Sequence, residues 1–115
     1  MDVSVIIVSY NCKNFLQVCI DSVLSSFSNI SGEILIVDNN STDGTQKFLK
    51  KFKHSIKLIE NNSNLGFARA NNIGSANAKG KFLLFLNPDT IIGENLIENY
   101  VKFYSSKKNI GLLSC

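Results

Sequence analysis

The chain has 115 residues, the length of one domain of ordinary size, and we treat residues 1–115 as a single domain. Hydrophobic residues make up 44% of the chain and the net charge is +3, so the composition indicates a globular protein and lacks the dense basic patch of a nucleic-acid-binding protein. Three cysteines and a single histidine argue against a disulfide-stabilised scaffold and against a His/Cys zinc cluster.

Strand-like and helix-like segments alternate along the sequence. Short apolar runs predict five strands, at residues 3–8, 34–37, 56–59, 82–86 and 110–113. Apolar or small residues at helical spacing predict four helices between them, at residues 15–27, from a cap at Ser41 or Thr42 to Phe52, at residues 66–78 and at residues 93–105. The first strand is too short to span a membrane and no signal-peptide features precede it, so the sequence favours a cytoplasmic protein.

This alternation predicts an α/β fold of three layers, with a mostly parallel sheet between two layers of helices. Ligands of such sheets bind beyond the carboxyl ends of the strands. Polar clusters follow three of the predicted strands, namely Ser9-Tyr10-Asn11, Asp38-Asn39-Asn40 and Asn87-Pro88-Asp89. The sequence therefore predicts a ligand site at this edge of the sheet.

Asp38 follows four apolar residues and is placed to accept a hydrogen bond from an N–H or hydroxyl group of a ligand. A nicotinamide-binding site would also need a glycine fingerprint after the first strand, which the sequence VSYNCKN does not contain. No GxxxxGK[ST] motif occurs either, so a P-loop is excluded. The alternative for Asp38 is an aspartate that only caps a helix or holds a turn.

Asp89 lies where a carboxylate can ligate Mg²⁺ or Mn²⁺ together with phosphate oxygens of a substrate. The alternative is an acidic residue that favours the start of a helix beside Thr90. Asn87 is a weaker candidate ligand, because its side chain is also suited to holding the turn.

Three further residues are candidates for binding a nucleotide. Tyr10 is suited either to stacking on an aromatic base or to packing in the core at the end of the strand. Gly66 lies at the predicted start of a helix, where free N–H groups and the positive end of the helix dipole favour a phosphate. Arg69 either reaches the same anion or is simply solvated.

Four segments resemble the family 2 glycosyltransferases of the GT-A fold in order and spacing: VSVIIVSYN, EILIVDNNSTDGT, NLGFARANNIGSANAKG and FLLFLNPDT. The resemblance covers nearly the whole chain and implies the N-terminal, nucleotide-sugar-binding part of such a domain. It implies the strand order 3-2-1-4, with the last strand at or near an edge. It also implies that four residues hold the nucleotide base: Ser9, Tyr10, Asn11 and Asp38.

The chain departs from the family in three places. The D-x-D motif, which binds the metal and the sugar nucleotide in the family, reads Asn87-Pro88-Asp89 here, so only its last acid is present. This form, with Gly66-Phe-Ala before it, is similar to rhamnosyltransferases that use dTDP-rhamnose, but Arg69 stands where that subgroup often has glycine. The chain is also much shorter than a GT-A catalytic domain, so we expect a truncated domain without the half that carries the catalytic base. We therefore nominate no catalytic residue.

The function implied by the resemblance is inverting transfer of a sugar from a nucleotide-diphosphate donor to a saccharide or lipid-linked acceptor, in the synthesis of cell-surface polysaccharide. The chain itself is expected to bind the donor and to transfer little or nothing. The resemblance admits contact of a full-length parent with the inner membrane face, and self-association through apolar surface that a missing half would cover. Two other hypotheses for the function stay open: a non-catalytic nucleotide-binding module and a purely structural α/β domain.

Overall fold

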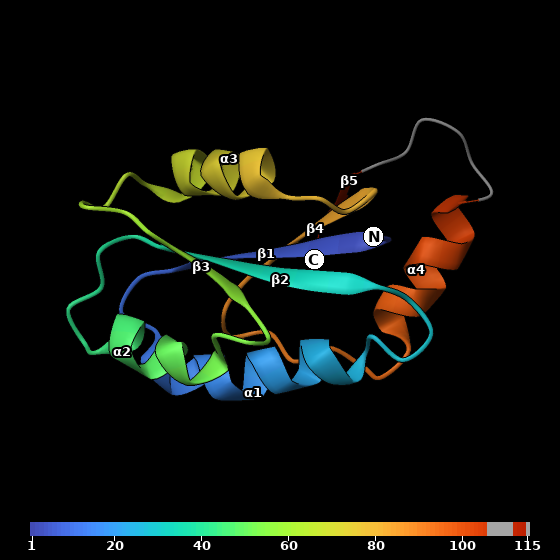
Figure 1. Ribbon diagram of the computed structural model, residues 1–115, viewed down its shortest axis with the longest axis horizontal. Coiled ribbons are helices and arrows are strands. Elements are labelled where there is room, and N and C mark those ends of the chain that lie inside the picture. The colour runs from blue at the N-terminus through green and yellow to red at the C-terminus, as the bar shows by residue number, and fades with distance from the viewer. Residues whose placement is uncertain (106–111, 115) are drawn as a thin grey trace.

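The computed structural model describes residues 1–105 and 112–114, in which helices flank a parallel sheet (Figure 1). The strands are β1 (Val3–Ser9), β2 (Gly32–Asp38), β3 (Lys57–Glu60), β4 (Phe82–Leu86) and β5 (Leu112–Ser114). The helices are α1 (Lys13–Ser25), α2 (Thr45–Leu49), the 3₁₀ turn η1 (Lys50–Phe52), α3 (Phe67–Asn77) and α4 (Leu96–Ser105).

The strand order of the sheet is β3-β2-β1-β4-β5, and every neighbouring pair is parallel. This confirms the predicted α/β class and the predicted order. The central strand β1 pairs with β2 so that Ser9 lies opposite Asp38, and Asp38 in turn lies opposite Glu60 of β3. The carboxyl ends of these three strands therefore reach the same edge of the sheet, which we call the strand-end edge.

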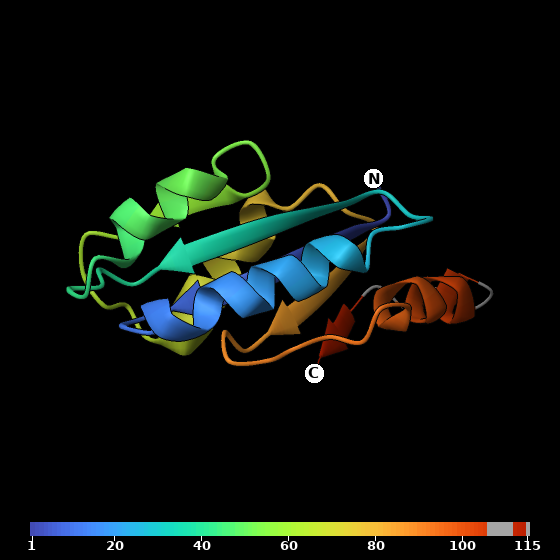
Figure 2. The same cartoon turned by 90° about the horizontal axis from the view of Figure 1, so that it is seen from below.

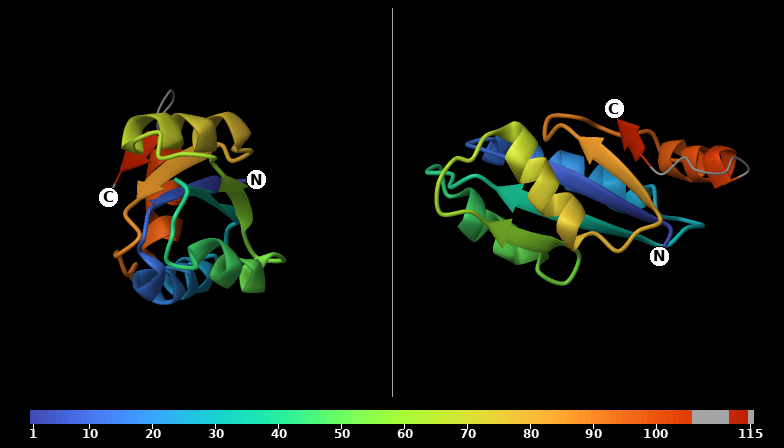
Figure 3. Two further views of the ribbon diagram at one scale, coloured as in Figure 1. Left: turned by 90° about the vertical axis from the view of Figure 1, so that its left-hand side faces the viewer. Right: turned by 90° about the horizontal axis from the view of Figure 1, so that it is seen from above.

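Helices cover both faces of the sheet. Figures 1 and 3 show α3 on one face, with α1, α2 and α4 on the other. Every residue of β1 is buried, because side chains of alternating direction meet a helix layer on either side. Val5 and Ile7 pack in a core with α1, whereas Val8 packs against Ala70 of α3. Gly74 lets α3 approach the sheet closely, since a Cβ atom there would lie 2.6 Å from Ile6.

The start of the second helix differs from the prediction. Neither Ser41 nor Thr42 caps it, because α2 begins only at Thr45 and no side chain caps its first turn. The hydroxyl of Ser41 binds Asp38 instead, and the chain turns into α2 through Gly44, whose φ of +86° suits glycine. Capping at Ser41 or Thr42 was therefore wrong, because the Ser41 hydroxyl donates to Asp38 and accepts from the Asn11 N–H instead.

The last two elements are shifted relative to the prediction. Helix α4 starts at Leu96 rather than residue 93, because an irregular loop follows β4 along α1, where the Ile92 N–H donates to the Ser22 hydroxyl at 3.1 Å. The fifth strand is present at Leu112–Ser114, while residues 110 and 111 of its predicted range lie outside the described residues.

The strand-end edge and α4 lie at opposite ends of the molecule, as Figures 1 and 2 both show. Within residues 1–105 and 112–114, none of the helices has the length and hydrophobicity needed to cross a bilayer.

Candidate functional site

Asp38 is the centre of the strand-end edge. Its carboxylate is fully buried and accepts four hydrogen bonds. The hydroxyls of Ser9 and Ser41 donate to Oδ1 at 2.7 and 2.6 Å. The Ser41 N–H and the side-chain amide of Gln46 donate to Oδ2 at 2.9 and 2.7 Å. Two donors on each oxygen replace the water that this buried group loses, so the carboxylate joins β1, β2 and α2.

These contacts change how Asp38 is interpreted. The prediction considered a ligand-binding aspartate or a turn aspartate, and the four internal bonds show that it does hold the loop after β2. Gln46 is half-buried, whereas Ser9 and Ser41 are buried. The side of Oδ2 where Gln46 binds is therefore the side that a ligand reaches most easily. Direct binding of a ligand by Asp38 stays a prediction, and it requires a donor to give way.

Asn39 connects the strand-end edge to the start of α3. Its side-chain oxygen accepts from Asn61 Nδ2 at 2.9 Å and from the Leu65 N–H at 3.4 Å, and its Nδ2 donates to the Gly66 carbonyl at 3.2 Å. Asn39 is almost fully buried. Asn39 was not among the predicted site residues, although its place directly after Asp38 in a polar cluster was a usable signal.

Gly66 turns the chain into α3. Its φ of 84° and ψ of 167° belong to a region open essentially only to glycine. The first turn of α3 lies at the strand-end edge (Figure 1), and no side chain caps it. Its first N–H groups are therefore free of a capping side chain. Arg69, in the first turn of α3, is exposed and forms no ion pair with the described residues. Gly66 and Arg69 are thus accessible to a ligand, and their contact with a phosphate stays a prediction.

The loop after β1 is fastened to the loop after β2. The Asn11 N–H donates to the Ser41 hydroxyl at 2.9 Å, and the Asn11 side-chain oxygen accepts from the Thr42 N–H at 2.7 Å. Asn11 has a φ of +52°, a conformation that asparagine tolerates better than most residues. Tyr10, the residue before Asn11, is 49% exposed. The core alternative for Tyr10 is therefore wrong, and its ring is available to a ligand.

The loop after β4 completes the edge. The Asn87 carbonyl accepts from the Thr90 N–H at 3.1 Å and from the Cys19 thiol at 3.9 Å, so Asn87 holds a turn through its backbone. Asp89 is exposed and forms no hydrogen bond or ion pair with other described residues. Those residues contain no cluster of three or more His, Cys, Asp or Glu side chains that could hold a metal ion. To hold an ion, Asp89 would therefore need ligands from outside the described residues, such as oxygens of a substrate.

Two thiols lie beneath these loops. Burial raises the pKa of Cys12, and the negative charges of Asp43, Asp38 and Asp89 raise it further. Cys12 therefore experiences the charge of Asp89, which follows β4, as well as the charges of Asp38 and Asp43. Burial also raises the pKa of Cys19 to about 11. Both thiols are protonated at neutral pH, so neither is an activated nucleophile.

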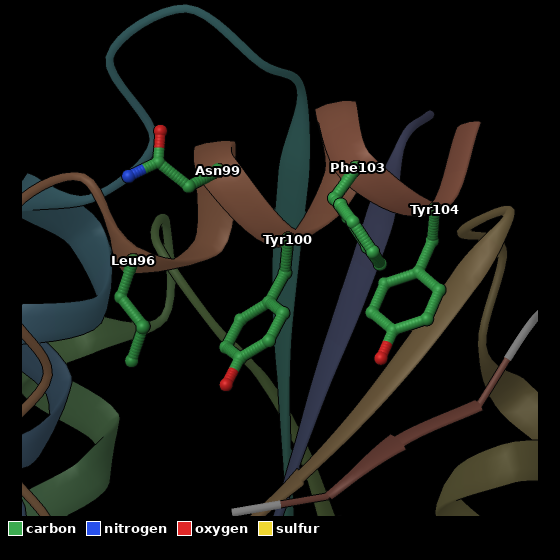
Figure 4. A pocket seen from close by; sticks show the side chains of 5 residues that line it. All are labelled: Leu96, Asn99, Tyr100, Phe103 and Tyr104. Atoms are coloured by element: carbon green, nitrogen blue, oxygen red, sulfur yellow. The ribbon is translucent and has the colours of Figure 1, made fainter. Parts of the chain in front are cut away.

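An apolar groove lies far from these residues. It has a volume of about 370 Å³, and its described lining comes from α4: Leu96, Asn99, Tyr100, Phe103 and Tyr104. Leu96, Tyr100 and Tyr104 project from the same side of the helix (Figure 4), and the two tyrosine rings stack with centroids 6.1 Å apart. None of the predicted site residues lines this groove.

Known proteins with similar sequences match most of the chain. The chain is 39% identical over 108 residues to the UDP-Glc:alpha-D-GlcNAc-diphosphoundecaprenol beta-1,3-glucosyltransferase WfaP of Escherichia coli, and the match covers 92% of the chain and 42% of that protein. The chain thus spans less than half the length of this relative.

Solved structures share the fold at lower identity. Residues 1–349 of TarS from S. aureus superpose with a TM-score of 0.83 at 24% identity, over 92% of this chain and 33% of that one. The mannosyltransferase PcManGT from Pyrobaculum calidifontis, in complex with GDP-Man and Mn²⁺, gives 0.82 at 23% identity, over 90% and 32%. The family model described as glycosyl transferase family 2 matches residues 4–113. The chain therefore belongs to glycosyl transferase family 2.

Proposed function

We propose that the chain binds the nucleotide-diphosphate part of an activated sugar at the strand-end edge. The observation that carries this proposal is the set of hydrogen bonds made by Asp38 and Asn39, which join the end of β1 and the loop after β2 to the start of α3. These bonds hold the segment that presents the exposed Tyr10 ring beside the uncapped start of α3, and the exposed Asp89 carboxylate follows β4 at the same edge of the sheet. Such preorganisation lowers the cost of binding.

The base of the nucleotide would lie against Tyr10. Its half-exposed ring offers a face for stacking, and Asn11 fixes the backbone beside it. An N–H group of the base would take the place of Gln46 at Oδ2 of Asp38, because Gln46 is the most accessible of the four donor groups. The exchange keeps the buried carboxylate satisfied, which limits its cost.

The diphosphate would lie between α3 and Asp89. The uncapped first turn of α3 offers N–H groups and the positive end of a helix dipole, and Arg69 adds a full positive charge. Mg²⁺ or Mn²⁺ fits here only as an ion shared between Asp89 and diphosphate oxygens, a common arrangement for Mg²⁺. When bound, the ion would offset charge on the leaving diphosphate.

For the whole protein we infer transfer of the sugar to a saccharide or lipid-linked acceptor in cell-surface polysaccharide synthesis, by a cytoplasmic enzyme that works at the inner membrane face. The support is family membership and the acceptor in the name of the E. coli relative, which is linked to diphosphoundecaprenol. We assign no catalytic base. Glu98 is paired with Lys102 at 2.9 Å on α4, far from the strand-end edge.

The test is a thermal-shift titration with UDP-, GDP- and dTDP-sugars at millimolar concentration, with and without Mn²⁺. A ligand that binds the folded state raises the melting temperature by mass action. We expect Tyr10→Ala to weaken the shift and Asp89→Ala to remove the part that depends on Mn²⁺. If no nucleotide sugar stabilises the protein, or if both variants respond like the parent, the site assignment is wrong.

A non-catalytic nucleotide-binding module is the second candidate, because every residue assigned above has a binding role and none has a catalytic one. One measurement distinguishes the two functions: the release of nucleoside diphosphate from the donor when an acceptor is present. Donor binding without release would support the module, whereas acceptor-dependent release would support the transferase.

A further inference from the structure

A strongly basic surface adjoins the strand-end edge and takes no part in the proposed donor site. Between Asp43 and Glu60 the sequence contains five lysines, one histidine and no acid. Four lysines, which we call the lysine face, surround a hollow of about 590 Å³ together with Gly44 and Phe48: Lys13, Lys47, Lys50 and Lys51. All four are exposed, and none forms an ion pair with the described residues.

The lysine face is assembled by tertiary structure. Lys47, Lys50 and Lys51 share one side of the continuous turn formed by α2 and η1, since residues three and four apart are neighbours on a helix. Lys13 comes from the start of α1, and its N–H donates to Asp43 Oδ2 at 3.1 Å. Asp43 is the acid nearest to the face in sequence, and it also accepts hydrogen bonds from Thr45. Asp43 forms no ion pair with these lysines, but its negative charge still offsets one of the four positive charges of the face.

The hollow also has an aromatic wall. Phe48 is half-buried and lines the hollow, the Lys51 ammonium lies 5.1 Å from the centre of its ring, and Phe52 packs edge-on against it at 5.6 Å. Clusters of lysines attract the headgroups of anionic lipids, and the partly exposed ring of Phe48 adds apolar surface beside them.

We infer that the lysine face docks the protein on an anionic lipid surface, with the strand-end edge beside the membrane. The inference deepens the proposed function and rests on its lipid-linked acceptor, which would be presented in the same plane. The face consists of lysines, which are mobile point charges suited to a diffuse surface, whereas recognition of a single phosphate favours the planar fork of arginine. The chain's single arginine, Arg69, lies on α3 across the sheet.

The position of the face supports this orientation. Gln46 binds Asp38 and the next residue, Lys47, belongs to the face, so one helical turn joins the membrane contact to the donor platform. In Figures 1 and 2, α2 lies at the same end of the molecule as the carboxyl ends of β1 and β2. Helix α3 covers the face of the sheet opposite to α2.

The test is co-sedimentation with vesicles of phosphatidylcholine, with or without about one-third phosphatidylglycerol. We expect binding to the anionic vesicles alone, weakened by salt. Because each lysine near an anionic surface raises partitioning about fivefold, Lys50→Gln/Lys51→Gln should lower it roughly 25-fold. The matched control is Lys79→Gln/Lys81→Gln, which removes the same charge at the start of β4, where the Lys81 N–H binds the Met1 carbonyl. It should lower partitioning less than threefold.

Several outcomes would overturn the inference. These are equal binding to neutral vesicles, equal losses in the two double variants, and tighter binding to a single-stranded oligonucleotide than to vesicles. Release by inorganic pyrophosphate, but not by chloride at the same ionic strength, would assign the hollow to a free phosphate compound instead. The assay contains no nucleotide sugar, so its failure is distinct from failure of the donor-binding proposal, which the thermal-shift titration measures separately.

Discussion

The hydroxyl of Ser9 lies 2.7 Å from Oδ1 of Asp38, and this bond joins the carboxyl ends of neighbouring strands β1 and β2. Both residues are fully buried. The platform of the candidate site is therefore part of the fold itself, and substitutions there affect stability as well as binding.

Asp38→Asn should lower the free energy of unfolding by about 3 kcal/mol, because an amide hydrogen would face buried donors that now bind a carboxylate. Urea denaturation measures this loss. The control is Asp89→Asn, which makes the same change at an exposed residue without hydrogen bonds to other described residues, and should stay within about 0.5 kcal/mol of the parent. Equal effects of the two substitutions would contradict the structural role of Asp38.

Asn39→Asp should loosen the segment before α3. The substitution keeps the shape of the side chain but replaces the amide that donates to the Gly66 carbonyl with an oxygen, which costs about 2 kcal/mol. The Leu65 N–H donates a hydrogen bond to the side-chain oxygen of Asn39, and hydrogen exchange at this N–H should become faster. Asn62→Asp, at an exposed position in the same loop, should leave that exchange rate unchanged.

Gly66→Ala should destabilise the protein through its backbone. No atom lies within 4 Å of the added Cβ, so the cost comes from the φ of +84° and should be about 1–3 kcal/mol. Gly93 also has open space around a new Cβ and has no positive φ, so Gly93→Ala should be nearly neutral. Thermal unfolding of both variants tests the difference, and a neutral Gly66→Ala would show that the chain leaves this conformation easily.

The raised pKa of Cys19 predicts a loss of stability in alkali. A folded-state pKa of about 11, above the value of 9.0 that serves for an ordinary thiol, means that the contribution of this group is complete below pH 9 and disappears as the pH rises towards 11. The decline in unfolding free energy between pH 9 and 11 should be smaller in Cys19→Ala than in the parent. Parallel pH profiles would show that Cys19 ionises equally in both states.

Much of the fold could be predicted because its signals are local. The apolar run at residues 3–8 predicts a strand buried on both faces, and β1 is buried throughout. The polar residues after β1, β2 and β4 lie at strand ends as expected, because turn chemistry is encoded by neighbouring residues. Where the prediction failed, as with capping at Ser41, a distant group competed for the side chain: the hydroxyl accepts from the N–H of Asn11, 30 positions away.

The sequence by itself determined the order of strands and helices and the family to which the chain belongs, because apolar periodicity and motif spacing do not depend on long-range contacts. Tertiary structure decided that Asp38 is satisfied by its own chain, that Asn39 bridges to α3, and that Tyr10 is open. It also brought Lys13 beside the lysines of α2 and η1. The reason is physical: Ser9 and Asp38 are 29 positions apart, and only folding of the intervening chain places their polar atoms within hydrogen-bonding distance.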